Sequence, residues 1–273
     1  MAFDPGPPPQ IRFAVHLDDA RIEAFHRDGF THVERITTDE ELAWLEPLYD
    51  ALFADRRGAW RGGYFDLARP YESEGPDLVP QVLMPDLRFP QLRQTTLVRN
   101  AIAIGAQLLG VPESELRTWS HMISKPPRVG GALPWHQDEA YWDTGFRYRA
   151  LGCWTPLDPA TRESGCMHFI PGSHREGIRP HRHIGDDPRV HGLVTDAVDE
   201  RRAVAIPLAP GGATFHHCRT LHHTPPNTSD RVRRAWANEV QLDPAPLAEG
   251  EDADRPWVRA GREAWNQRRL PGR

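Results

Sequence analysis

Hydrophobic and polar residues are arranged differently in the two parts of the chain. The first 110 residues contain long segments that begin or end with residues favoured at helix termini. One segment begins with a pair of threonines and an acidic first turn, and another is ended by Gly110. The predicted helices cover residues 17–28, 37–58 and 92–109, with a strand over residues 31–36. The N-terminal part is therefore expected to be mainly helical.

From about residue 116 onward, apolar residues come in short runs separated by proline and glycine. These runs cover residues 117–125, 149–157, 166–170, 203–208, 212–217 and 233–242. Short strands at this spacing, with turn residues between them, are typical of a β sandwich or barrel. We expect a mainly β protein in which the N-terminal helices buttress a double-sheet β core.

No sequence feature divides the chain into two domains. It has no internal repeat and no linker rich in glycine or serine. One domain is expected over residues 1–273, with a flexible proline-rich start over residues 1–12. From about residue 245 to 273, an acidic run and several arginines offset each other in charge, and we interpret this segment as a solvated tail.

Composition and charge argue against several classes of function. The 273 residues are 39% hydrophobic and 26% charged, with a net charge of -5, which is ordinary for a globular protein. The absence of a clustered basic excess argues against a nucleic-acid partner. Because the sequence has neither a long apolar run nor a secretory signal, we expect a cytoplasmic protein without a membrane partner. Three cysteines, Cys153, Cys166 and Cys218, are predicted to be reduced core residues.

One polar pair has the spacing of metal ligands. In the stretch PWHQDEAYW, residues 134–142, one residue separates His136 from Asp138. Along a strand, residues i and i+2 face the same side, so these two side chains would project together while Gln137 points away. A histidine and a carboxylate on one face form part of a metal site, and a further ligand must come from elsewhere in the chain.

A histidine-rich segment, residues 216–234, can supply that ligand. It contains His216, His217, His222 and His223, followed by Asn227 and by Arg231, Arg233 and Arg234. Two imidazoles and one carboxylate leave three octahedral positions open, which is typical of non-haem Fe(II) oxygenases rather than of structural zinc sites. An arginine beyond the last ligand suits a cosubstrate that carries a carboxylate.

Three motifs follow one another along the chain: PWHQD, ESGCMHFIPGSH and, starting at His222, HxxxxNxxxxxR. Together with FHRDGFTHVERI near the N-terminus, they resemble the phytanoyl-CoA dioxygenase family up to about residue 243. The resemblance implies a double-stranded β-helix (jelly-roll) fold and an enzyme that uses Fe(II), 2-oxoglutarate and O₂. The implied reaction is hydroxylation of an unactivated C–H bond in a small organic molecule, with release of succinate and CO₂, in natural-product tailoring or catabolism.

The same resemblance implies roles for individual residues. His222 precedes Asn227 by five residues and Arg233 by eleven, as the family's metal ligand does. His136, Asp138 and His222 are therefore expected to form the catalytic metal site, and Arg233 to hold 2-oxoglutarate. Further cosubstrate contacts are expected at Trp154, Thr224, Gln137, His121 and Gln81. The contact expected of Gln137 conflicts with simple strand alternation.

Substrate contacts are expected close to the ligands, at Tyr141, Trp142 and His223. One of His216 and His217 is expected to face the core, where it can orient a ligand. The histidines at 174, 181 and 183 are interpreted as loop residues, and the loops over residues 57–80 and 175–200 as determinants of the substrate. Two alternatives remain: epimerisation, cyclisation or desaturation by the same iron chemistry, or a cupin-like isomerase or binding protein that does not use 2-oxoglutarate.

Overall fold

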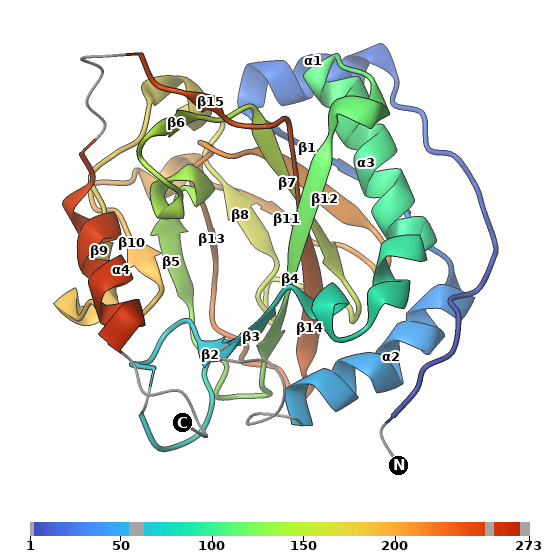
Figure 1. Ribbon diagram of the computed structural model, residues 1–273, viewed down its shortest axis with the longest axis horizontal. Helices are drawn as coiled ribbons and strands as arrows, with labels where there is room; N and C mark the ends of the chain where they lie inside the picture. Colours follow the sequence, from blue (N-terminus) through green and yellow to red (C-terminus); the bar gives the residue numbers. More distant parts are fainter. Residues whose placement is uncertain (1–2, 55–62, 72, 249–253, 268–273) are drawn as a thin grey trace.

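Two antiparallel sheets face each other across the centre of the protein (Figure 1). This computed structural model describes residues 3–54, 63–71, 73–248 and 254–267. In spatial order, the larger sheet contains β1 (Phe30–Val33), β12 (Ala213–His217), β7 (Ala150–Pro156), β14 (Arg233–Gln241), β4 (Arg117–Lys125), β3 (Pro80–Leu83) and β2 (Tyr64–Asp66). The smaller sheet contains β11 (Val204–Ile206), β8 (Met167–Phe169), β13 (His222–Thr224) and β5 (Leu133–His136).

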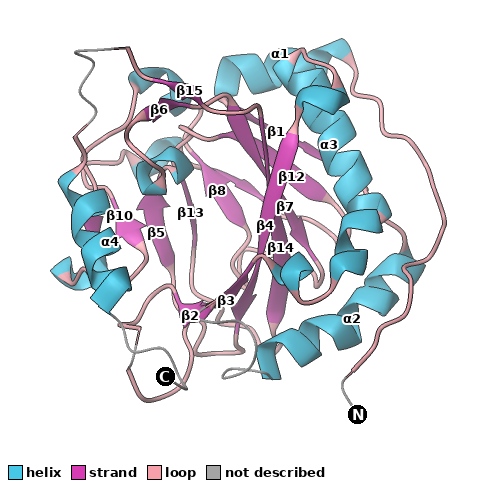
Figure 2. Cartoon of the chain, viewed as in Figure 1, coloured by secondary structure: helices cyan, strands magenta, loops and turns pink. Residues whose placement is uncertain are grey.

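Helices flank the two sheets on opposite sides (Figure 2). On one side lie α1 (Asp19–Asp28), α2 (Asp39–Ala54) and α3 (Thr96–Leu109), and on the other lies α4 (Pro256–Gln267). Two short strand pairs are β9 (Arg182–His183) with β10 (Leu193–Val194), and β6 (Phe146–Arg147) with β15 (Ala245–Pro246). The 3-10 helices are η1 (Pro85–Leu87), η2 (Pro90–Gln94), η3 (Glu113–Glu115), η4 (Asp138–Tyr141), η5 (Ser173–Glu176), η6 (Ile184–Asp186) and η7 (Glu200–Arg202).

Strands that are distant in sequence lie side by side in both sheets. In the larger sheet, β14 lies between β4 and β7, and in the smaller sheet β13 lies between β5 and β8. This arrangement of two facing antiparallel sheets is that of a jelly roll, so the predicted fold is confirmed. The fold brings the ligand candidates on β5 and β13 together, because His136 and His222 are direct partners across this strand pair.

Alternation along β14 separates the helix-facing surface from the interior between the sheets. Trp236 and Val240 belong to the hydrophobic cluster that includes α2 and α3, whereas Ala235 and Ala237 pack on the opposite side of the strand. Gly105 allows α3 to approach closely, because an added Cβ there would lie 2.7 Å from a methyl carbon of Val240. The helices thus brace the sheet and leave its inner face free to line a site.

The predicted N-terminal helices are confirmed within the described residues, although residues 55–58 of the second one lie outside them. Two expectations about the chain ends need correction. Residues 3–12 lie against the helices, since the indole of Trp44 donates to the carbonyl of Pro5 at 2.9 Å and the hydroxyl of Thr96 donates to that of Ile11 at 2.5 Å. The expected solvated tail instead contains α4, which packs beside β9.

Two further expectations can be compared with the structure. Cys153, Cys166 and Cys218 are buried and unpaired, as predicted. No helix among the described residues is both long and apolar enough to cross a membrane.

A buried carboxylate joins α2 to the beginning of α3. Glu41 is buried, and its two carboxylate oxygens accept hydrogen bonds from the main-chain N–H groups of Thr96 at 2.6 Å and Leu97 at 2.9 Å. The first N–H groups of a helix have no partner within the helix, and a negative charge there is favoured by the helix dipole. Glu41 therefore caps α3 from a neighbouring helix and determines how the two helices meet.

Substitution of this carboxylate should destabilise the fold. We expect Glu41→Leu to lower the free energy of unfolding by about 2–4 kcal/mol, because two buried N–H groups lose a charged acceptor. Urea unfolding followed by circular dichroism measures the change. The matched control is Glu40→Leu, whose side chain is exposed on the same helix and whose effect should stay within about 0.5 kcal/mol. Equal midpoints for the two variants would contradict the capping role.

Candidate active site

Three side chains from the smaller sheet and the turn after it converge on one point. His136 ends β5, Asp138 begins η4 and His222 begins β13. The Oδ1 atom of Asp138 lies 3.4 Å from Nε2 of His222 and 4.0 Å from Nε2 of His136. The three potential ligand atoms lie within 4.8 Å of one another. Two imidazoles and one carboxylate at this spacing can bind one divalent cation on a single face.

Hydrogen bonds orient each of these ligand candidates. The Nδ1 atoms of His136 and His222 lie 2.7 Å and 2.9 Å from the carbonyls of Pro134 and Thr220, so both Nε2 atoms face the carboxylate. On the other side, Nε2 of His216 lies 2.9 Å from Oδ2 of Asp138. Contacts of this kind hold metal ligands in the required tautomer and direction. His216 therefore confirms the expectation that one histidine of the 216–217 pair faces the core.

The electrostatic environment favours the cation-binding protonation states of Asp138 and His136, whereas for His222 the effect of burial is outweighed by Asp138, which raises the pKa of that ring. Burial alone would raise the pKa of Asp138, but His222 and His216 bring that pKa well below its usual range. Burial, with a contribution from His222, holds the pKa of His136 well below its usual value. At neutral pH Asp138 is thus a carboxylate and His136 a neutral imidazole, which are the forms that bind metal.

A buried arginine that has no anionic partner among the described residues lies in the same cavity as these three residues. Arg233 begins β14, is 1% exposed and lines this cavity together with the ligand candidates. Its Nε and Nη1 atoms have no hydrogen-bond partner, and its guanidinium lies 5.2 Å from the ring centre of Trp154. Burial lowers its pKa to about 10, so the group remains charged at neutral pH. A buried cation with free donors is suited to a ligand that carries a carboxylate.

The remaining predicted cosubstrate residues divide into three groups. Thr224, Trp154 and His121 line the cavity that contains Arg233. Gln81 contacts His121 in this wall, because Oε1 of Gln81 lies 2.9 Å from Nδ1 of His121. Burial lowers the pKa of His121 to about 4, which leaves a neutral ring against the cavity. The remaining residue, Gln137, lies elsewhere and is described below.

Comparisons with known proteins can now be set beside this geometry. A family model described as phytanoyl-CoA dioxygenase (PhyH) matches residues 25–235. The chain belongs to the phytanoyl-CoA dioxygenase family. The resemblance seen in the sequence motifs is thereby confirmed, and the matched range contains all of the expected ligands and Arg233.

Relatives within the phytanoyl-CoA dioxygenase family match different shares of the chain. The phytanoyl-CoA dioxygenase domain-containing protein 1 of Danio rerio is 35% identical over 127 residues, which are 44% of this chain and 43% of that protein. The chain thus matches less than half the length of this relative. The crystal structure of EvdO2 from Micromonospora carbonacea var. aurantiaca, complexed with 2-oxoglutarate, is 39% identical, has a TM-score of 0.78, and covers 91% of this chain and 99% of its own.

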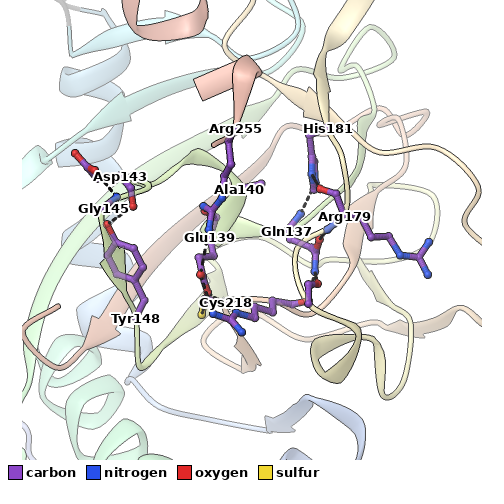
Figure 3. A network of polar contacts seen from close by, with 12 residues as sticks. Gln137, Glu139, Ala140, Asp143, Gly145, Tyr148, Arg179, His181, Cys218 and Arg255 are labelled. Atoms are coloured by element: carbon purple, nitrogen blue, oxygen red, sulfur yellow. Dashed lines mark hydrogen bonds and ion pairs between the residues drawn. The ribbon is translucent and has the colours of Figure 1, made fainter. Parts of the chain in front are cut away.

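The position of Gln137 corrects the cosubstrate contact that the family resemblance implies. Its side-chain amide donates to the carbonyls of Gly177 and Arg219, both at 2.7 Å, and its oxygen accepts from the N–H of Arg179 at 2.8 Å. Figure 3 shows the side chain directed into this loop region. Simple alternation on β5 was therefore the better guide, because His136 and Gln137 point to opposite sides.

Two of the three predicted substrate residues lie away from the cavities next to the ligands. The ring of Trp142 packs on Tyr148, with 4.8 Å between ring centres. His223 lies between Trp135 and His168, 4.1 Å and 4.8 Å from their ring centres, because it alternates with His222 on β13. These placements correct the substrate contacts expected of Trp142 and His223.

Tyr141 occupies the predicted position beside the metal-ligand candidates. Its ring meets that of His136 edge to face, with 5.8 Å between the centres, and its hydroxyl accepts a hydrogen bond from the N–H of Leu193. Tyr141 also lines a second cavity of about 330 Å³. The walls of this second cavity include Tyr71, Leu83, His191, Trp257, Gly261 and Trp265. Part of the wall comes from the loops over residues 57–80 and 175–200, of which residues 57–62 and 72 lie outside the described residues.

The histidines at 174, 181 and 183 have contacts with main-chain atoms. Nδ1 of His181 lies 2.7 Å from the carbonyl of Arg179, and Nδ1 of His183 lies 2.8 Å from that of Val190. Nε2 of His174 lies 3.3 Å from the carbonyl of His26. Only His181 is a loop residue as interpreted, since His174 lies in η5 and His183 ends β9; none of the three belongs to the group of potential ligands at Asp138.

Sequence reasoning missed one acidic residue of the cavity. Glu239 is buried, lines the cavity with Arg233, and its Oε2 atom has no hydrogen-bond partner. Burial raises its pKa well above the usual range, which favours the neutral acid over the carboxylate. Its even spacing from Arg233, through Ala235 and Ala237, is the signal that could have identified it.

Removal of the His216 contact should weaken metal binding. We expect His216→Phe to raise the Kd for Mn(II) about 10–100-fold, because the Asp138 carboxylate loses the group that orients it. Electron paramagnetic resonance of free Mn(II) gives this Kd. His32→Phe is the control, since His32 lies partly exposed on β1 in the same sheet and should bind Mn(II) as the unmodified protein does. Equal Kd values for both variants would be incompatible with an orienting role for His216.

Proposed function

We propose that this protein is an Fe(II)/2-oxoglutarate-dependent dioxygenase that oxidises a C–H bond of a small organic molecule. One observation carries the proposal. A single cavity is lined by two histidines, a carboxylate and a buried arginine that has no anionic partner among the described residues. Two imidazoles and one carboxylate are the ligand set of non-haem Fe(II) oxygenases. A cupin-like isomerase would have no use for the buried Arg233 cation.

Each protein group has a defined task in this proposal. His136, Asp138 and His222 hold Fe(II) and leave part of its coordination shell for other ligands. Arg233 binds the distal carboxylate of 2-oxoglutarate, while Trp154 and Thr224 confine its chain. Bound Fe(II), with 2-oxoglutarate and O₂, supplies the oxidising power, and 2-oxoglutarate is converted to succinate and CO₂. The surrounding sheets exclude water and orient the reactants.

Relatives support the choice of cosubstrate. EvdO2, whose solved structure contains 2-oxoglutarate, resembles almost the whole described chain. A probable alpha-ketoglutarate-dependent hypophosphite dioxygenase of Stutzerimonas stutzeri is 28% identical over 211 residues, which are 76% of this chain and 72% of that protein. Within this chemistry we propose hydroxylation as the outcome, because the carboxylate of Asp138 occupies the position that a halogenase leaves open for halide.

The second cavity is the proposed place of the substrate. It is about 330 Å³ in volume and borders the ligand turn through Tyr141. Polar groups on its wall are already engaged: the Trp257 indole donates to the carbonyl of Ala140 at 2.9 Å, and Arg262 pairs with Asp143 at 3.2 Å. Aromatic faces therefore dominate what a ligand meets, which favours a small uncharged molecule over a CoA thioester with its phosphates.

Loss of the proposed cosubstrate anchor tests the function. We expect Arg233→Leu to weaken 2-oxoglutarate binding to the Mn(II)-loaded protein by at least about 100-fold, because a desolvated charged hydrogen bond is lost. Calorimetry measures the affinity, and substrate-free succinate formation with Fe(II) and ascorbate should fall in parallel.

The exposed Arg231 provides the matched control for that variant. Arg231 precedes β14 and shares the parity of Arg233 in the sequence, but its side chain lies on the surface. We expect Arg231→Leu to bind 2-oxoglutarate with wild-type affinity. Unchanged affinity in Arg233→Leu, or no succinate from the wild-type protein, would contradict the proposed function.

A further inference from the structure

The segment just before α4 reaches into the turn that carries Asp138. Arg255 precedes this helix and is 8% exposed, and it lies outside residues 25–235 that match the family model. Figure 3 shows its side chain extending to Glu139 and Ala140. Its Nη1 donates to the main-chain carbonyl of Glu139, and its Nη2 lies 3.3 Å from Oε1 of the same residue.

The Glu139 carboxylate is buried between two arginines. It is 1% exposed, and Arg219 approaches it from the other side, with Nε 2.7 Å from Oε2 and Nη2 3.0 Å from Oε1. The thiol of Cys218 also donates to Oε2, at 3.4 Å. Arg219 alone is sufficient to balance the charge of Glu139. The presence of the second arginine, Arg255, is therefore better explained by its contact with the main-chain carbonyl than by charge balance.

The main-chain groups of the same turn are held from both sides. The N–H of Glu139 donates to the carbonyl of Cys218 at 3.0 Å, while Arg255 binds the carbonyl of Glu139. The Trp257 indole donates to the next carbonyl, that of Ala140, at 2.9 Å. Two consecutive carbonyls of η4 thus accept hydrogen bonds from residues of the C-terminal segment, and that of Glu139 also accepts one from the N–H of Trp142 at 3.2 Å. Asp138 is the first residue of this short helix and Tyr141 the last.

The arginines of α4 itself do not share the buried environment of Arg255. Arg259 is 63% exposed and pairs with Asp254, and Arg262 is 59% exposed and pairs with Asp143. Such surface pairs contribute little to a local structure. Arg255 differs from both because its donors are buried against the carbonyl and the carboxylate of Glu139, the residue directly after a proposed metal ligand.

We propose that Arg255 is a positioning residue for Asp138, through which the C-terminal segment holds the metal-ligand turn in place. The inference rests on the proposed metal site. The N–H of Glu139, which Cys218 holds, lies in the peptide plane that follows Asp138, and the carbonyl of Glu139, which Arg255 binds, lies in the next plane; holding both planes restricts the backbone from which the Asp138 carboxylate projects. The same segment places Trp257 and Gly261 in the wall of the second cavity, so it connects that cavity to the ligand turn.

Cobalt binding by the full chain tests this role with an optical signal. The d–d absorption of bound Co(II) reports the arrangement of its ligands and does not depend on catalysis. We expect Arg255→Leu to raise the Kd for Co(II) about 10-fold or more and to change the d–d spectrum, because Asp138 is held less firmly. Arg255→Lys should recover part of the affinity, since an ammonium group can still bind one carbonyl.

Arg259→Leu is the matched control, since Arg259 lies four residues later, on α4, with an exposed side chain. We expect it to retain the wild-type Kd and spectrum. If Arg255→Leu does not fold, Trp257→Phe replaces it as the test, because it removes the indole donor to Ala140 and keeps an aromatic side chain. That variant should show a smaller change of the same kind.

The outcomes separate this inference from the proposed function. Wild-type Kd and spectrum in folded Arg255→Leu, or in Trp257→Phe where that variant replaces it, would overturn the positioning role and leave the metal site intact. Absence of Co(II) binding by the wild-type protein would overturn the proposed metal site itself. A weakened Kd with an altered spectrum in Arg255→Leu, alongside an unchanged Arg259→Leu, supports the inference.

Discussion

The structure depends on the placement of one carboxylate, that of Asp138, which is 16% exposed, among three imidazoles. His136 and His222 come from the smaller sheet and His216 from the larger one, so the two sheets must close correctly before the three rings surround Asp138. A carboxylate that is removed from water requires charged or hydrogen-bonding partners nearby. The Nδ1 atoms of His136 and His222 lie against main-chain carbonyls, so the Nε2 atoms of both rings face the Asp138 carboxylate. The space that these atoms face is the proposed position for a cation.

The same cavity also contains the buried guanidinium of Arg233. One face of β14 contributes Arg233, two alanines and Glu239 to the interior, while the other face contributes Trp236 and Val240 to the contact with the helices. Ala237 lies between Arg233 and Glu239 on this strand and lines the cavity with only a small side chain. Gly152 has a similar effect on β7, because an added Cβ would lie 2.7 Å from the His216 ring. Small residues in the middle of the strands thus create the space, and polar residues define its ends.

Much of this arrangement could be predicted from the sequence because it follows local rules. The N-terminal helices have recognisable ends, and the spacing of His136, Asp138, His222 and Arg233 follows a family motif. Residue roles that depend on side-chain direction were less predictable. Gln137 and His223 were expected in the site on the basis of the motif, but alternation directs both away from it.

The contacts of the C-terminal segment could not be predicted. The segment interpreted as a solvated tail forms α4 and supplies Arg255 and Trp257 to the ligand turn. The apolar positions Trp257, Val258, Gly261 and Trp265 have helical spacing, but the sequence does not specify which surface they cover. Glu139, the partner of Arg255, lies more than a hundred residues earlier in the chain.

The most direct test of the central claim is a crystal structure of the protein grown without oxygen in the presence of Fe(II) and 2-oxoglutarate. The account predicts one iron bound by Nε2 of His136, Nε2 of His222 and the carboxylate of Asp138, with the distal carboxylate of 2-oxoglutarate on Arg233. Iron bound by other residues, or 2-oxoglutarate bound without contact to Arg233, would contradict it.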